Sequence, residues 1–136
     1  MKLLREVCVV GLILTSLAGA QDSPAPALRK GVSVQMAAAN HSVEMREADE
    51  PNAEVVAITA NGEVYEGIQR TEPTALSRLS AKTIYVKADG RVPYQTLLTV
   101  LDALHGKSVV LLTAPPANAQ KAKYVSPYGI EMIVPR

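Results

Sequence analysis

The chain has 136 residues, a formal net charge of +1, and five tyrosines as its only aromatic side chains. This length suits one small domain, which is often marginally stable alone and gains from dimerisation. The 14 basic residues, set against 13 acidic ones, form no basic stripe. This distribution argues against nucleic-acid binding, which depends on concentrated positive charge.

The first 20 residues have the pattern of a secretory signal peptide. A basic start, Lys2 and Arg5, precedes an apolar stretch over residues 7–17, and small side chains follow. This pattern predicts cleavage between Ala20 and Gln21. The alternative is an uncleaved membrane anchor, although the apolar stretch is shorter than the roughly 20 residues that a spanning helix needs.

The next segments are extended or irregular by their composition. Residues 21–30 contain two prolines and several alanines, which predicts a linker. Over residues 31–36, valine and methionine alternate with polar side chains, and this period predicts a half-buried strand. Residues 40–52 are polar and acidic, and we expect a loop there.

The clearest predicted hairpin surrounds Asn61-Gly62. Asn-Gly suits a two-residue type I′ turn because both central residues need a positive φ. Such a turn would place Ile58 opposite Tyr65, and would bring Val64 and Ile68 together on the other face of the hairpin. We expect one face to pack on a helix, and the face of Val64 and Ile68 to be a candidate contact for a partner chain. The predicted contact is a homodimer, or the capture of an extended peptide along an edge strand.

A short helix, a strand and a longer helix are predicted next. A capping hydroxyl at Thr71 and an early proline predict a short helix over residues 73–80. Residues 83–88 are rich in β-formers and predict a strand. Pro93 then opens a longer helix, which Gly106 ends. An i, i+3, i+4 pattern predicts its buried stripe, formed by Tyr94, Leu97, Leu98, Leu101 and Leu104.

The apolar residues 109–113 predict a strand inside a sheet. Residues 130–134 predict one more strand, which can pair with its own sheet, with a second copy or with another protein. The segments together predict an α+β domain with a small sheet of about four or five strands and two helices on one face. The predicted divisions are a signal peptide (1–20), a linker (21–30), the domain (31–113) and a linker with a C-terminal extension (114–136).

Several of these segments resemble the ExbD/TolR family. The resemblance begins at Val34-Gln35-Met36 and continues through the hairpin over residues 60–65. Its most specific part keeps Lys87-Ala88-Asp89, Val92-Pro93-Tyr94 and Val100-Leu101-Asp102 in this order. It covers residues 31–113.

ExbD/TolR proteins are periplasmic partners of proton-driven motors in the Gram-negative envelope. The resemblance implies the fold of their periplasmic domain, a homodimer, and a role as an accessory in energy-coupled biopolymer transport. The implied partners are ExbB/TolQ-like motor subunits or TonB/Pal-like envelope proteins. The expected location is the periplasm, or the outside of the cell by secretion, after signal cleavage. The alternative is the inner membrane, if residues 1–20 remain as an anchor. The signature residues Asp89, Pro93, Tyr94 and Asp102 are then candidate interaction sites.

The chain departs from this family in its N-terminal segment. ExbD-like proteins carry a transmembrane helix with a proton-handling aspartate, whereas residues 7–20 contain no acidic residue and Glu6 stands at the start of the apolar run. A motor needs an intramembrane carboxylate to take up and release protons. The alternative function is therefore a free-standing periplasmic binding module for cell wall or peptide, without motor coupling.

We expect no catalytic, metal or cofactor site. Asp89 is interpreted as a cap of the turn before the helix, flanked by Lys87 and Arg91, and Asp102 as a solvated helix residue. The two histidines lie in unrelated segments, and the only cysteine lies in the signal segment, so no metal-binding set is complete. No nucleophile elbow, phosphate loop or dinucleotide fingerprint occurs. The sequence therefore favours a protein that is not an enzyme.

Overall fold

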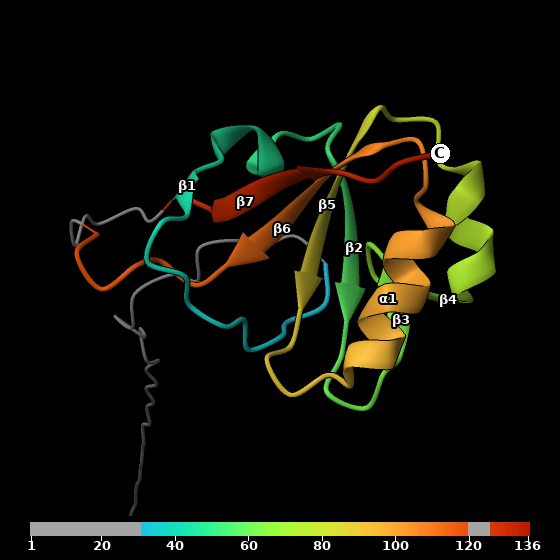
Figure 1. Ribbon diagram of the computed structural model, residues 1–136, viewed down its shortest axis with the longest axis horizontal. Helices are drawn as coiled ribbons and strands as arrows, with labels where there is room; N and C mark the ends of the chain where they lie inside the picture. Colours follow the sequence, from blue (N-terminus) through green and yellow to red (C-terminus); the bar gives the residue numbers. More distant parts are fainter. Residues whose placement is uncertain (1–30, 120–125) are drawn as a thin grey trace, which may run out of the picture.

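The computed structural model describes residues 31–119 and 126–136, which form a seven-stranded mixed sheet in the order β1-β7-β6-β5-β2-β3-β4 (Figure 1). The predicted signal peptide, its cleavage site and the linker over residues 21–30 lie outside the described residues. The strands are β1 (Val43–Glu44), β2 (Glu54–Ile58), β3 (Val64–Glu66), β4 (Gln69–Thr71), β5 (Thr83–Ala88), β6 (Ser108–Thr113) and β7 (Tyr128–Ile133). The helices are α1 (Tyr94–Ala103) and the 3-10 helices η1 (Arg46–Asp49) and η2 (Pro73–Arg78).

A parallel unit forms the centre of the sheet. β5 lies between β2 and β6 and runs parallel to both, and α1 connects β5 to β6. Residues 84–87 are buried on both faces of β5, which explains the near-continuous apolar run in this strand. The predicted strand–helix–strand unit is confirmed, with Pro93 as the N-cap of α1 and Gly106, at φ +80°, beyond its end.

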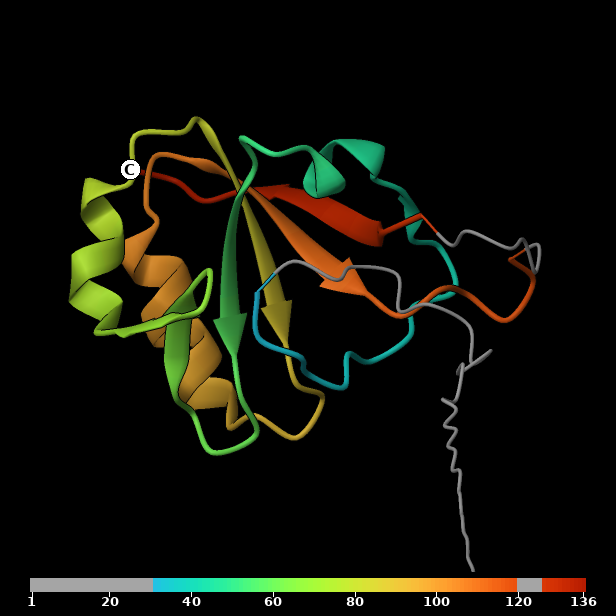
Figure 2. The ribbon, with the colours of Figure 1, turned by 180° about the vertical axis from the view of Figure 1, so that it is seen from behind.

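Both α1 and η2 lie on one face of the sheet, as predicted (Figures 1 and 2). The predicted short helix is a 3-10 helix, and its Leu76 and the following Leu79 are buried. These two side chains belong to the main core, together with Val100 and Leu104 of α1 and with inward residues of the strands. The mixed α/β architecture therefore follows from one apolar sheet face covered by two helical segments.

The buried stripe of α1 differs from the predicted one. Val100 and Leu104 are fully buried and Leu97 is half-buried, whereas Tyr94 is 73% exposed and Leu98 is 39% exposed. The helix is rotated so that its valine faces the sheet. The prediction missed the burial of Val100 because it followed the leucines and the tyrosine, which outnumber valine along the helix. An i, i+3, i+4 pattern is compatible with more than one rotation of the helix about its axis.

The opposite face of the sheet is covered by η1 and the residues around it. Ala48 of η1 packs with Tyr85 and Val110 from the strands, and Met36, Met45 and Ala53 pack against them. The predicted loop over residues 40–52 therefore contains a covering element. The predicted strand over residues 31–36 is wrong, because only Met36 forms an isolated bridge, with Asp89.

The register of the β2–β3 hairpin is shifted by one residue from the predicted one. Ile58 pairs with Val64 rather than with Tyr65, because the turn spans Thr59 to Gly62 and leaves a longer loop. A shift of one residue exchanges the two faces of a strand. Val64 is accordingly 3% exposed in the helix-side core, and the predicted shared face of Val64 and Ile68 is wrong.

The last predicted strand pairs with its own sheet. β7 runs antiparallel to β6 over the whole of Ser108–Thr113, so the sheet extends beyond residue 113. The count of seven strands exceeds the predicted number because β1 and β4 are very short and lack an alternating apolar pattern. Within the described residues, no helix has the length and apolar character needed to cross a bilayer.

Candidate interaction site

The loop between β5 and α1, residues 89–93, is organised around the Asp89 carboxylate, which is 4% exposed. Its Oδ1 accepts the backbone N–H of Arg91 at 3.0 Å, and its Oδ2 accepts the backbone N–H of Gln35 at 3.1 Å. The Arg91 guanidinium donates to both oxygens, from Nε at 2.9 Å and from Nη2 at 3.1 Å. Asp89 therefore caps the turn, as expected, and also binds the backbone of Gln35, which is distant in the sequence.

These contacts hold Asp89 in its ionised form. The hydrogen bonds from the Arg91 side chain and backbone are the main reason that the pKa of Asp89 lies well below its ordinary value, although burial opposes them. Asp89 is an anion at any physiological pH. Its role in this loop is to fix the backbone rather than to take up and release protons.

The segment that Asp89 fastens crosses the carboxyl ends of β5 and β6. Gly90 N–H donates to the Gln35 carbonyl at 2.8 Å, and Ala114 N–H donates to the Ala37 carbonyl at 2.9 Å. Residues 35–37 are thus tied to the end of each strand. Their position explains why they form isolated bridges instead of a strand, since they run across the strand ends.

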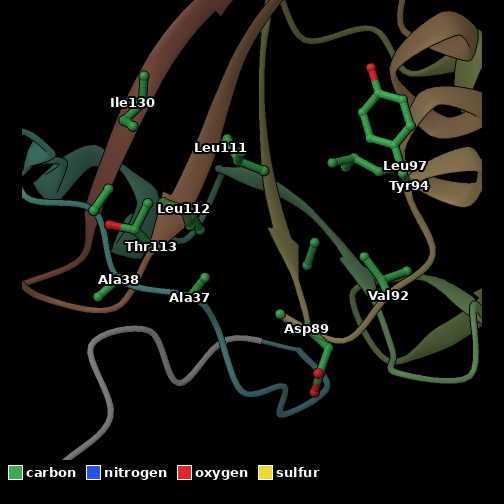
Figure 3. A pocket seen from close by; sticks show the side chains of 13 residues that line it. Ala37, Ala38, Asp89, Val92, Tyr94, Leu97, Leu111, Leu112, Thr113 and Ile130 are labelled. Carbon is green, nitrogen blue, oxygen red and sulfur yellow. The ribbon is translucent and has the colours of Figure 1, made fainter.

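A groove of about 330 Å³ opens on the helix-covered face, between α1 and β7 (Figure 3). Figures 1 and 2 show α1 lying toward the β2–β3 side of the sheet. Tyr94 and Leu97 of α1 form one wall, Ile130 of β7 stands opposite, and Leu111 lies between them. Ala37 and Ala38 lie at one end of the groove. The lining is mostly aliphatic, as in sites that bind apolar groups.

Thr113 is a polar residue of this lining. It is 5% exposed, and its hydroxyl oxygen has no hydrogen-bond partner among the described residues. A buried hydroxyl without a partner is energetically unfavourable.

The structure separates the residues singled out in the sequence. Asp89 and Tyr94 line the groove, and Pro93 lies between them in the chain. Asp102 is exposed on another side of α1, beside His105 and η2, which agrees with its interpretation as a solvated residue. Ile68 is 79% exposed, in the turn between β3 and β4.

Sequence reasoning missed the β6 and β7 residues of the groove. Leu111 and Ile130 are cross-strand partners, although 19 positions separate them in the sequence. The alternation of Ile130, Met132 and Val134 was a usable signal for a half-buried strand, but it gave no information on its pairing partner.

Lys87 is another residue whose environment the sequence did not indicate. It lies in β5 on the face opposite α1 and is only 2% exposed. Burial lowers its pKa from the ordinary lysine value. In residues 31–119 and 126–136, no group of three or more His, Cys, Asp or Glu side chains is placed to hold a metal ion.

No protein-family profile matches the chain, and no curated protein matches it.

Proposed function

We propose that this chain is a non-enzymatic, ExbD/TolR-like accessory of an energy-coupled biopolymer transport system, and that it acts by binding other envelope proteins. The observation that carries the proposal is the apolar groove beside α1. Its rim includes Asp89, Val92 and Tyr94, which belong to the most specific part of the family resemblance. We also propose that the chain has the fold of the family's periplasmic domain. The observed mixed sheet, with α1 and η2 on one face, is compatible with this fold.

The proposed occupant of the groove is an extended segment of a TonB/Pal-like partner that carries aliphatic side chains. The aliphatic lining suits such side chains. Tyr94 stands 73% exposed at the rim. Tyrosines in such positions often contribute strongly to protein–protein binding, because they combine a large apolar ring with a polar end.

The proposed role is that of an accessory, and proton transfer is left to ExbB/TolQ-like subunits. The low pKa of Asp89 keeps its carboxylate ionised, so it is unsuited to carrying protons.

We also propose export to the periplasm with cleavage between Ala20 and Gln21. Mass spectrometry of the exported protein should give a chain that begins at Gln21, and an intact Met1 terminus in the membrane fraction would contradict the cleavage.

Co-purification in mild detergent tests the proposed function. The wild-type chain should retain ExbB/TolQ-like or TonB/Pal-like proteins, and Tyr94→Ala should lose the TonB/Pal-like ones. Ile68→Ser is the matched control, since it also removes an exposed apolar side chain but lies outside the groove. A wild-type chain that retains none of these partners would overturn the transport proposal.

The second candidate is a free-standing binding module for cell wall or peptide. The volume of the groove favours it, because about 330 Å³ lies at the lower end of the range, roughly 300–1,000 Å³, of small-ligand sites. The test is binding of isolated peptides or cell-wall fragments to the purified chain in the absence of motor subunits. Binding by the wild type that is lost in Tyr94→Ala would support this candidate.

A further inference from the structure

A second hollow lies on another side of α1, where this helix packs against η2 (Figures 1 and 2). Its volume is about 270 Å³, and it shares no lining residue with the groove. Most of its lining side chains carry an oxygen or a nitrogen atom, whereas the lining of the groove is mostly aliphatic. The polar residues of the hollow are Thr74, Ser77, Thr99, Asp102 and His105.

Two hydroxyl groups of the hollow give their hydrogens to the backbone. The Ser77 hydroxyl donates to the Thr74 carbonyl at 3.1 Å, and the Thr99 hydroxyl donates to the Gln95 carbonyl at 2.9 Å. A hydroxyl has a single hydrogen, so each of these oxygens keeps only lone pairs for a ligand. The Thr74 hydroxyl can rotate and accept as well.

His105 and Asp102 also present acceptors. The Nδ1 of His105 lies 2.9 Å from the backbone carbonyl oxygen of Asp102. A carbonyl oxygen only accepts, so Nδ1 carries the hydrogen, and in the neutral imidazole Nε2 keeps its lone pair. The carboxylate of Asp102 adds a negative charge, and it forms no ion pair within residues 31–119 and 126–136. The hollow therefore offers mainly lone pairs, with one anionic group among them.

The end of α1 strengthens the negative potential of the hollow. The carbonyl groups of a helix point toward its C-terminus and give that end a partial negative charge. The last turn of α1 contains no basic side chain that would compensate this charge, and this turn contributes Asp102 and Ala103 to the hollow. The hollow therefore favours a cation over an anion.

The side chains also distinguish between kinds of cation. Zinc sites use three or four protein ligands, and no group of three or more His, Cys, Asp or Glu side chains is placed for a metal ion in the part of the chain that the structure describes. An alkylammonium needs only hydrogen-bond acceptors, because its nitrogen carries three N–H donors. The carbon atoms of Pro73 and Ala103 also line the hollow and can contact the alkyl stem of such a ligand.

We propose that this hollow binds a primary alkylammonium group, whose charge pairs with the Asp102 carboxylate. The remaining N–H groups find acceptors among the Ser77 and Thr99 hydroxyl oxygens and the Nε2 of His105. Small amines and the lysine side chains of proteins both carry this group. The site requires neither the groove nor a motor subunit, so this proposal and the proposed function can fail independently.

NMR titration of the ¹⁵N-labelled full chain with n-butylammonium tests the site, at constant ionic strength and about pH 8, where histidine is ordinarily neutral. The backbone amide signals of Ser77, Thr99 and Ala103 should shift and saturate. n-Butanol has the same stem without the charge and should leave them unchanged. Absence of saturable shifts would overturn the proposal. Equal shifts around η1, on the other face of the sheet, would also overturn it, because they would show attraction to any exposed carboxylate.

Substitutions test the residues of the hollow. Asp102→Asn keeps the size of the side chain and removes its charge, so it should weaken binding of n-butylammonium about fivefold, the upper end of the effect of an exposed ion pair. Thr99→Val replaces one acceptor by a methyl group and should weaken binding about twofold. Glu47→Gln removes an exposed carboxylate of η1 and is the matched control, with binding as in the wild type. A folded Asp102→Asn variant with unchanged affinity would contradict the proposal.

Peptide probes identify the source of the amine. The blocked tripeptide Ala-Lys-Ala is compared with n-butylammonium and with blocked Ala-Gln-Ala. Binding of the lysine peptide at least as tight as that of n-butylammonium would assign the site to a lysine side chain of a partner protein, and weaker binding would assign it to a small amine. Equal binding of the lysine and glutamine peptides would contradict recognition of the ammonium charge.

Discussion

Asp89 and Gln35 are 54 positions apart in the sequence, and they are joined by a hydrogen bond of 3.1 Å from the Gln35 N–H to Asp89 Oδ2. The Gln35 carbonyl accepts a second hydrogen bond, from Gly90 N–H at 2.8 Å. These two bonds fix the segment that begins at Gln35 against the end of β5. Because Ala37 and Ala38 in this segment line one end of the groove, the shape of the groove depends on the Asp89 carboxylate.

Replacing Asp89 by alanine should lower the melting temperature and release the segment after Gln35. The reason is that Asp89→Ala removes the acceptor for two backbone N–H groups and the partner of Arg91. Thermal unfolding measures the first effect, and faster hydrogen exchange at the Gln35 and Gly90 amides measures the second. Arg91→Ala is the matched control, and its effect should be much smaller because its side chain is 70% exposed. Equal effects of the two substitutions would contradict a backbone-fixing role for Asp89.

Acid should destabilise the wild type through the same carboxylate. The pKa of Asp89 is lower in the folded chain than its ordinary value of 3.8, so the unfolded chain binds the proton more tightly. The contribution of Asp89 to the free energy of unfolding is fully present above pH 3.8. It is lost as the pH falls through the lower pKa that Asp89 has in the folded chain. Urea unfolding at decreasing pH should show a steeper loss for the wild type than for Asp89→Asn. Parallel pH profiles for the two proteins would rule out this contribution.

The strand–helix–strand unit could be predicted from the sequence because its signals are local. Pro93 opens α1, Gly106 follows it, and the flanking apolar runs have the length of buried strands. The capping of the loop by Asp89 was also predictable, because a carboxylate before a helix commonly accepts backbone N–H groups. Each of these features depends on residues a few positions apart.

The features that could not be predicted depend on residues distant in the sequence. The bond between Asp89 and Gln35, the pairing of Leu111 with Ile130 and the burial of Lys87 all require knowledge of which strands are neighbours. The hairpin register failed for a different reason. Asn-Gly is compatible with turns of more than one length, and the longer turn that ends at Gly62 moves Val64 to the other face.

The corrected buried stripe of α1 makes a prediction about two leucines of the same helix. Leu104 is fully buried, whereas Leu98 is 39% exposed. Leu104→Ala should lower the free energy of unfolding by about 2–5 kcal/mol, and Leu98→Ala should lower it by less than about 1 kcal/mol. Urea unfolding measures both values. Similar losses of stability for the two variants would contradict the observed burial and would support the prediction from the sequence, in which both leucines are buried.

Lys87 should give the stability of the protein a second pH dependence, in the alkaline range. Burial lowers the pKa of Lys87 in the folded chain from the ordinary value of 10.5. Between the folded value and 10.5, the unfolded chain binds more protons than the folded chain, so stability rises with pH in this window. Below the folded value both states carry the proton, and the contribution of Lys87 to stability is constant.

Lys87→Met removes this titration and keeps a side chain of similar length in the middle of β5. Urea unfolding from neutral pH to 10.5 should show the wild type gaining stability relative to Lys87→Met as the pH rises. Comparing the two proteins cancels the titration of Tyr85, which lies two positions away and whose pKa is raised by burial. Lys82→Met, which removes an exposed lysine, controls for the loss of a positive charge. A constant difference between wild type and Lys87→Met, or one that moves in the opposite direction, would contradict the lowered pKa of Lys87.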